Sequence, residues 1–377
     1  MSQGQESDQS RPLRAIVREL LDRSRPYSSL QIRDLVPLAG DASTRQYVRC
    51  VTDSKTIPSF IVMKLSTALG PVGGGPRKLT QDDTFVELLH FFREHGVRVP
   101  ELYLDAREDG YLLVEDIGDV ALWNIVLKDS SEAIDRVLDG LPSDPVMYLY
   151  KKAVDVIVRL QKIPVEKEIV LFERTVSFEQ YRKEISEVVE YLLAPKGLRK
   201  PEQEAFGEVF DAVCESIASH PRVPAHFDCM SHNVYVGPEK EIVLIDFQDA
   251  SLNSPVRDIL ALLNDRDIDS ALGKSRHAEL LSYFIETAKV KDFARLYNEY
   301  LFHWDCRVSG RFGLLAYQKG RKKYEQWIDG TLRRLARTIL RTHRDFPGMD
   351  DLLEIGMRYL PAMREGVEDP WPLPTPK

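Results

Sequence analysis

The sequence predicts an α+β protein of two lobes, a small β-rich N-terminal lobe and a larger, mostly helical C-terminal lobe. Short β-branched and aromatic runs, which are typical of strands, lie before residue 116, and the chain becomes mainly helical after it. The 377 residues are enough to build a core in each lobe. We expect an N-terminal extension with one amphipathic helix over 1–29, the N-lobe over 30–116 and the C-lobe over 117–377.

Composition and charge exclude several classes of protein. Hydrophobic residues make up 43% of the chain and charged residues 29%, which argues against both disorder and a membrane protein. No run approaches the length of a spanning helix, and the polar residues 1–10 do not resemble a signal peptide. The net charge of −8 disfavours generic nucleic-acid binding. The four cysteines lack C-x-x-C spacing, which favours a reduced, cytoplasmic protein.

The elements expected before residue 116 follow from local pattern. Helical spacing of apolar residues predicts the first helix, through Leu13, Ile16, Val17, Leu20 and Leu21. We then expect a strand–turn–strand unit over 35–47, a strand over 60–64, a helix over 82–95 and a strand over 111–114. The second helix begins at Asp82 or Asp83 and ends at Gly96, and its buried face is formed by Phe85, Leu88, Leu89 and Phe92.

The C-lobe carries clear helix start signals. Asp144 followed by Pro145 predicts a helix through Leu160. Ser177 with Gln180 resembles a capping box and predicts a second helix of the C-lobe, which reaches residue 193. A third helix over 202–219 leads to the segment that carries the chemistry.

That segment begins at His226 and ends at Asp246. Asp228 precedes Asn233 by five residues, and Asp246 follows Asn233 by thirteen. Residues 234–236 and 242–245 read as two strands joined by a turn over 237–240. Because a hairpin brings its two ends together, Asn233 and Asp246 should lie side by side, with Asp228 on the loop that leads in.

Two oxygen ligands beside a separate carboxylate suit phosphoryl transfer to a hydroxyl group. Asn233 and Asp246 would hold Mg²⁺ on the phosphates of a nucleotide, and Asp228 would orient the attacking hydroxyl and accept its proton. The alternative is an ordinary hairpin with polar residues at its ends. The complete spacing favours a kinase.

Two strings resemble the aminoglycoside phosphotransferase family, whose members have a protein-kinase-like fold: His226-x-Asp228-x4-Asn233 and Ile-Asp-Phe-Gln-Asp-Ala over 245–250. The second string is similar to that of the bacterial cell-wall sugar kinases, which phosphorylate the anomeric hydroxyl of N-acetylmuramate and N-acetylglucosamine. Gly-Asp-Ala-Ser-x-Arg-x-Tyr over 40–47 is also similar to a string near the start of that group. The resemblance covers residues 30 to 340.

The resemblance implies ATP and Mg²⁺ as cofactors and places further residues at the nucleotide. The turn with Gly40 and Ser43 would approach the phosphates through backbone N–H groups, although it could also be a plain hairpin turn. Lys64 lies where kinase-like folds carry a phosphate-binding lysine, and Glu87 is its natural partner or, equally, a solvated glutamate. Backbone groups near Glu115 and Ile117 would bind adenine.

The resemblance also implies supporting roles. His226 should hold the catalytic loop by hydrogen bonds, and Asp258 should brace it. The Arg expected after His226 is Phe227, so support for the loop must come from elsewhere. Arg45 could reach the nucleotide or the substrate, or do neither. A later helical stretch could line the substrate cleft or simply pack and solvate a helix, through His303, Trp304, Arg307, Arg311 and Tyr317.

The favoured function is an ATP-dependent kinase for an amino sugar in cell-wall recycling. Aminoglycoside resistance, or another small-molecule acceptor such as choline or homoserine, is the alternative within the enzyme class. A nucleotide-binding pseudokinase scaffold is the alternative outside it, although all three metal and base positions are filled. We expect a small-molecule substrate and neither nucleic acid nor membrane as partner.

Overall fold

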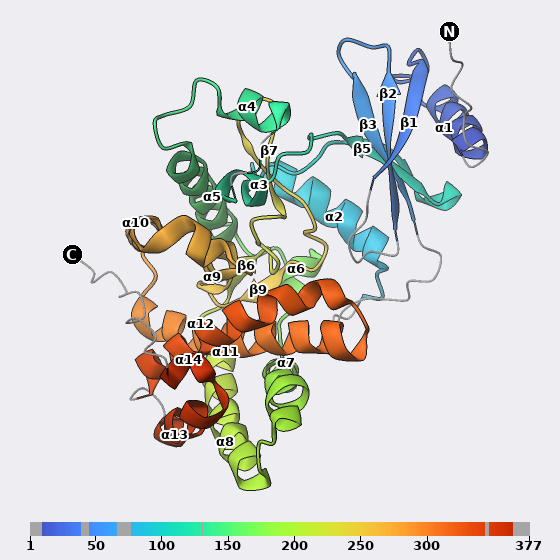
Figure 1. The fold of residues 1–377 in the computed structure, drawn as a ribbon. Helices are drawn as coiled ribbons and strands as arrows, with labels where there is room; N and C mark the ends of the chain where they lie inside the picture. The colour runs from blue at the N-terminus through green and yellow to red at the C-terminus, as the bar shows by residue number, and fades with distance from the viewer. Residues whose placement is uncertain are drawn as a thin grey trace.

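The computed structural model of the protein describes residues 10–38, 45–65, 77–127, 129, 131–343 and 347–364. The N-lobe is built on a five-stranded sheet in which each neighbouring pair is antiparallel, in the order β1-β2-β3-β5-β4. Its strands are β1 (Ile32–Leu38), β2 (Gln46–Thr52), β3 (Ser59–Lys64), β4 (Leu102–Ala106) and β5 (Tyr111–Glu115). The predicted two-lobed α+β architecture is confirmed, with this sheet in the N-lobe and mostly helices in the C-lobe (Figure 1).

Helix α1 (Ser10–Arg23) covers one face of this sheet, as Figure 1 shows. The apolar side of the helix, with Val17, Leu20 and Leu21 almost fully buried, packs in one cluster with Phe60 and Leu113 of the sheet. Arg18 also donates a hydrogen bond to the carbonyl oxygen of Leu30. The predicted amphipathic helix therefore packs against the N-lobe through its apolar residues.

Helix α2 (Gln81–Glu94) packs with the opposite face of the sheet. Side chains of a strand alternate between faces, and Met63 and Leu112 join the cluster of α2, whereas Val62 and Leu113 join that of α1. The helix begins earlier than predicted, because Thr80 is the N-cap and forms a capping box with Asp83. Its predicted buried face is correct: Phe85, Leu88, Leu89 and Phe92 are each at most 6% exposed.

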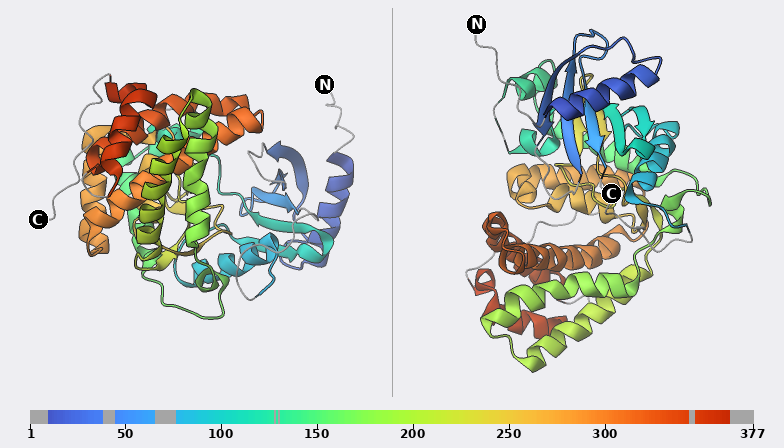
Figure 2. Two further views of the ribbon diagram at one scale, coloured as in Figure 1. Left: turned by 90° about the horizontal axis from the view of Figure 1, so that it is seen from below. Right: turned by 90° about the vertical axis from the view of Figure 1, so that its right-hand side faces the viewer.

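The C-lobe is a set of helices with two short two-stranded sheets (Figures 1 and 2). Helices α5 (Pro145–Gln161) and α7 (Phe178–Val188) begin at the predicted caps, Asp144 and Ser177, and α8 (Lys200–Ala218) is the predicted third helix. The π-helical turn η2 (Val189–Leu193) extends α7 to the predicted end. The small sheets pair β6 (Val223–Ala225) with β9 (Ser251–Asn253), and β7 (Val234–Val236) with β8 (Ile242–Leu244).

The other helices complete the lobe around a core that also contains α2. They are α3 (Leu122–Val126), α4 (Glu132–Leu138), α6 (Val170–Glu173), α9 (Arg257–Asn264), α10 (Ile268–Ala288), α11 (Phe293–Gly313), α12 (Ile328–Thr342), α13 (Met349–Tyr359) and α14 (Pro361–Arg364). Helices α7 and α11 pack closely at Gly310, where an added Cβ would lie 2.3 Å from the backbone nitrogen of Val188. Within the described residues, no helix is long and apolar enough to cross a bilayer.

Candidate active site

The predicted hairpin is present and brings Asn233 and Asp246 to its open end. Val234 pairs with Leu244 in the β7–β8 ladder, and the backbone N–H of Ile245 donates to the carbonyl oxygen of Asn233 at 3.1 Å. Asn233 is therefore one member of this hydrogen-bonded pair, and Asp246 directly follows the other, Ile245. The spacing of thirteen residues follows from two three-residue strands and the turn between them.

Asp246 is held in an unusual backbone conformation. Its φ of 62° is left-handed, which costs a non-glycine residue roughly 1–2 kcal/mol. The next residue, Phe247, is fully buried and stacks on Phe85 of α2 with ring centroids 5.0 Å apart. Gln248 donates to Oδ1 of Asp246 at 2.7 Å. Packing of Phe247 against α2 thus stabilises the turn that presents the Asp246 carboxylate.

The predicted catalytic loop, residues 226–233, is closed by hydrogen bonds to the carbonyl oxygen of Asp228. The N–H of Met230 donates to it at 2.7 Å, and the side-chain amide of Asn233 donates at 2.9 Å. With its nitrogen engaged, Asn233 keeps its side-chain oxygen available as a ligand. That oxygen and the Asp246 carboxylate are the hard donors that Mg²⁺ prefers, and the ion commonly takes its remaining ligands from phosphates and water. The residues present therefore fit a nucleotide-bound Mg²⁺.

Asp258, at the start of α9, braces this loop. Its carboxylate accepts the backbone N–H of His226 at 2.7 Å and that of Phe227 at 3.1 Å. Burial raises the pKa of Asp258, and these hydrogen bonds oppose that rise. His226 is itself fully buried, and its Nε2 donates to the carbonyl oxygen of Ile245 at 3.0 Å. Both side chains thus support the loop, and His226 ties it to the end of the hairpin.

Two charged residues that interact with Asp228, Arg257 and Asp249, were not singled out from the sequence. Arg257 places a buried guanidinium 3.5 Å from Oδ1 of Asp228. Burial raises the pKa of Asp249, and the carboxylates of Asp228 and Asp246 raise it further. Asp249 lies within the string that carries the family resemblance, which was the one signal for it. Arg257 had no comparable signal, because it comes from a different element.

The predicted phosphate-binding residues fall partly outside the described chain. Gly40 and Ser43 lie in 39–44, which is not among the described residues. Leu38 pairs with Tyr47, and Gln46 pairs with Lys64, so the residues that flank this segment lie at the end of the sheet where Lys64 ends β3. Lys64 is exposed there. Its role toward phosphate stays a prediction.

Glu87 neither pairs with Lys64 nor is simply solvated, the two alternatives that the sequence left open. The Glu87 carboxylate instead accepts two hydrogen bonds from Arg77, at 2.8 and 3.1 Å, and one from the backbone N–H of Val170 at 2.6 Å. Arg77 also binds Glu173 at 2.7 Å. Val170 and Glu173 are the first and last residues of α6, so Glu87 connects α2 to the C-lobe.

Arg45 has a structural contact that the sequence did not indicate. Its side chain is 5% exposed and donates to Oδ1 of Asp82 at 2.9 and 2.6 Å. It thereby ties the start of β2 to the start of α2. The alternative of an exposed arginine without a role is therefore wrong, and a contact of Arg45 with nucleotide or substrate stays a prediction.

Of the two residues expected to bind adenine between the lobes, one already uses its backbone N–H within the sheet. The backbone N–H of Glu115 already donates to the carbonyl oxygen of Glu101 at 2.8 Å, and Arg98 binds its carboxylate. Glu115 therefore closes the sheet, and its N–H is not available to a base. The N–H of Ile117 makes no hydrogen bond within the described part of the chain. Arg49 holds the intervening Asp116 through two hydrogen bonds, at 2.7 and 2.9 Å.

The residues suggested for the substrate cleft divide into two groups. His303 and Trp304 are buried and bond to backbone carbonyl oxygens, so they pack the core. Arg307 and Arg311 on the same helix pair with carboxylates of α7, each at 3.1 Å. Tyr317 is 57% exposed. The alternative that these residues pack a helix is therefore correct for His303 and Trp304.

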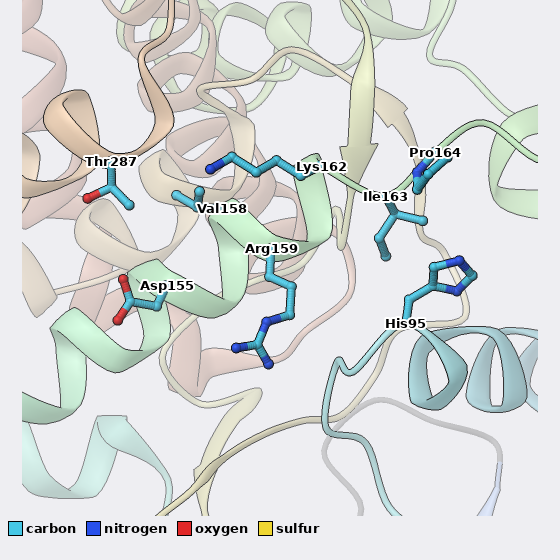
Figure 3. A pocket seen from close by; sticks show the side chains of 8 residues that line it. All are labelled: His95, Asp155, Val158, Arg159, Lys162, Ile163, Pro164 and Thr287. Carbon is cyan, nitrogen blue, oxygen red and sulfur yellow. The ribbon is translucent and has the colours of Figure 1, made fainter.

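A separate pocket of about 480 Å³ lies where α2, α5 and α10 end (Figure 3). Lys162 and Arg159 project from α5, and Thr287 from α10, around this hollow. None of the catalytic-loop or hairpin residues lines it. Its lining residues are His95, Asp155, Val158, Arg159, Lys162, Ile163, Pro164 and Thr287.

The sequence is similar to that of a known enzyme family and of named relatives. Residues 34–297 match the phosphotransferase enzyme family. A relative from Pseudomonas aeruginosa, named N-acetylmuramate/N-acetylglucosamine kinase, is 24% identical over 347 residues, which cover 89% of this chain and 90% of the relative.

Two solved structures share the fold. An ADP-bound aminoglycoside phosphotransferase, APH(2'')-Ib, superposes with a TM-score of 0.54 at 14% identity, covering 86% of this chain and 98% of its own. A choline kinase from Streptococcus pneumoniae superposes with a TM-score of 0.53 at 16% identity, covering 90% and 99%. The fold is therefore the kinase-like fold of these enzymes.

Proposed function

Because the chain belongs to the phosphotransferase enzyme family, we propose that it transfers the γ-phosphoryl group of ATP to the anomeric hydroxyl of N-acetylmuramate or N-acetylglucosamine. The observation that carries this proposal is the position of Asn233 and Asp246 at the open end of one hairpin, with Asp228 on the loop bonded to Asn233. This is the arrangement that phosphoryl transfer to a hydroxyl requires.

In the proposed reaction, Asp228 accepts the proton of the acceptor hydroxyl. The hydroxyl oxygen then bonds to the γ-phosphorus, the bond from that phosphorus to the bridging oxygen breaks, and ADP leaves. Asn233 and Asp246 would hold Mg²⁺, which supplies positive charge for the phosphates. Catalysis arises mainly from positioning and charge neutralisation. The Asp228 side chain is 23% exposed, so an acceptor hydroxyl has access to it.

The nucleotide would bind between the lobes. Lys64, at the end of β3, and the predicted turn with Gly40 and Ser43 are proposed to hold the phosphates. The N–H of Ile117 is proposed to bind the adenine ring, since that of Glu115 is already used within the sheet. The chain would work in the cytoplasm, where ATP is available and its four free cysteines stay reduced.

Two observations support an amino sugar as the acceptor. The relative from Pseudomonas aeruginosa carries that activity in its name, and residues 245–250 resemble the anomeric sugar kinases. An anomeric hydroxyl is also more acidic than an ordinary alcohol, so a single aspartate is a sufficient base. An antibiotic or choline-like acceptor is the second candidate, supported by the solved structures of similar fold.

A screen of ATP consumption tests this proposal. Purified protein with Mg²⁺ is offered N-acetylmuramate, N-acetylglucosamine, kanamycin and choline in parallel, with ADP release as the readout. We expect turnover with the two amino sugars and only background with the other two. Turnover confined to kanamycin or choline would replace the sugar assignment, and no turnover above background with any acceptor would favour a scaffold.

A further inference from the structure

Arg257 lies beside the proposed base and is held there by aromatic rings. Its side chain is 1% exposed, and Nη2 is 3.5 Å from Oδ1 of Asp228. The guanidinium carbon lies 4.5 Å from the centre of the Phe227 ring and 4.7 Å from that of Trp304. Ring faces attract a cation, most strongly where water is excluded. The two rings thus fix the cation next to the carboxylate.

Arg257 differs from other buried arginines of the same lobe. Arg334 donates hydrogen bonds to Asp305 and to the carbonyl oxygen of Arg266, and Arg174 donates to the carbonyl oxygen of Gln248. Neither terminal nitrogen of Arg257 makes a hydrogen bond within the described residues. Burying a charge without such bonds is costly, so its charge partner matters more. Among the described residues, Asp228 is the carboxylate that forms an ion pair with Arg257, while Asp258 and Glu184 also interact with its charge.

The distance between the Arg257 guanidinium and the Asp228 carboxylate also suits a base that must bind a substrate. At 3.5 Å the contact is an ion pair, longer than a charge-assisted hydrogen bond. The lone pairs of Asp228 therefore remain available to an acceptor hydroxyl. In the described part of the chain, the Asp228 carboxylate has no hydrogen bond of its own. Its ion pair is with Arg257, and the charge of Arg307 also acts on it, although Arg307 pairs with Glu184.

We propose that Arg257 is a positioning residue, whose buried charge holds the Asp228 carboxylate in place for the acceptor hydroxyl. It supplies from α9 the support that is missing where Phe227 stands in place of the Arg expected after His226. Phe227 takes part as well, because its backbone is left-handed at φ 78° and its ring faces the guanidinium. The inference rests on the proposed function, since it takes Asp228 as the base.

A double-mutant cycle tests this role. Wild type, Arg257→Met, Asp228→Asn and the double variant are compared by initial rates of phosphate transfer from labelled ATP to N-acetylmuramate. We expect Arg257→Met to lower kcat by about 10²-fold, as for a misplaced catalytic group, with the KM for ATP unchanged. In the Asp228→Asn background the same substitution should cost less than about twofold, because its effect passes through the lost carboxylate. Arg257→Lys should recover part of the lost kcat.

Arg334→Met provides the matched control, since it removes a buried arginine of the same lobe that does not pair with Asp228. It should lower the melting temperature with kcat nearly unchanged. If Arg257→Met does not fold, Arg257→Lys takes its place in the cycle.

The outcomes separate the two proposals. If N-acetylmuramate is inert, the cycle is run with the acceptor that the screen finds, or with ATP hydrolysis by water, so a wrong acceptor leaves the Arg257 test intact. Equal losses from Arg257→Met in both backgrounds would overturn the positioning role alone. Wild-type turnover by Asp228→Asn would overturn the role of the base and the inference together.

Discussion

At the scale of single residues, Asp246 has a left-handed backbone conformation and carries an anionic side chain. The conformation is kept because Phe247 packs against α2 and Gln248 bonds to the carboxylate. Strain of this kind is often found at functional sites, where the surrounding structure enforces it. The side chain is thereby held at the open end of the hairpin, where we propose that it binds Mg²⁺.

Asp246→Ala should abolish turnover and Mg²⁺-dependent nucleotide binding, because it removes the anionic ligand. Asp246→Asn serves as the folding control, since asparagine tolerates a left-handed backbone and changes only the charge. Calorimetric titration with ATP in Mg²⁺ and in EDTA measures the effect. Both variants should bind ATP in Mg²⁺ as weakly as wild type does in EDTA. Unchanged affinity for Mg-ATP would remove Asp246 from the metal site.

Sequence reasoning was most successful for residues whose partners are near in the chain. Asn233 and Asp246 could be placed together because one short hairpin joins them. Arg257 and Arg77 could not be placed, since their partners Asp228 and Glu87 lie on other elements. For the same reason, neither alternative for Glu87, a pair with Lys64 or a solvated side chain, included its partner Arg77. A motif predicts which charges are present, whereas the packing of distant elements decides which of them meet.

At the scale of elements, helix starts were predicted where a side chain caps its own helix. Asp144 and Ser177 accept N–H groups three residues on, and both positions were correct. The start of α2 was placed too late because Asp82 and Asp83 also fit a cap, whereas Thr80 fills it. The contacts of α1 with the sheet could not be read from its pattern, which shows an apolar face without showing what covers it.

Helix α2 is the element that connects the two lobes. It contributes Phe85 and Phe92 to the rings around Phe247, and Glu87 to the contact with α6. It therefore contacts the sheet, the turn that carries Asp246 and the C-lobe at once. A change in the position of α2 would therefore move Phe247 and, with it, the neighbouring Asp246.

At the scale of the whole molecule, the main core runs without a break from α2 into the C-lobe helices. Buried polar groups within it make folding sensitive to pH. Burial lowers the pKa of His303 to about 4, below the ordinary value of 6.5, although its Nε2 donates to the carbonyl oxygen of Tyr181. The folded chain therefore resists protonation of His303 at a pH where the unfolded chain is protonated.

The free energy of unfolding should fall as the pH drops from 6.5 toward 4. Above 6.5 His303 is neutral in both states, and below it the unfolded chain takes up a proton that the folded chain does not bind until about pH 4. The contribution is at most on the order of 3 kcal/mol. Denaturant unfolding at a series of pH values measures it.

His303→Gln keeps a donor for the Tyr181 carbonyl oxygen and should show a weaker fall across this window. His90→Gln, at an exposed position of α2, is the control and should follow wild type. An identical pH dependence in His303→Gln and wild type would show that His303 is not responsible.

The central claim is phosphorylation of an anomeric hydroxyl, and phosphorus NMR of the product tests it most directly. The protein is incubated with Mg-ATP and either N-acetylglucosamine or its 1-O-methyl glycoside, which has no free hydroxyl at C1. We predict a phosphate resonance coupled to the C1 proton with the free sugar and no product with the glycoside. Phosphate on C6, or equal reaction of the glycoside, would contradict the anomeric assignment.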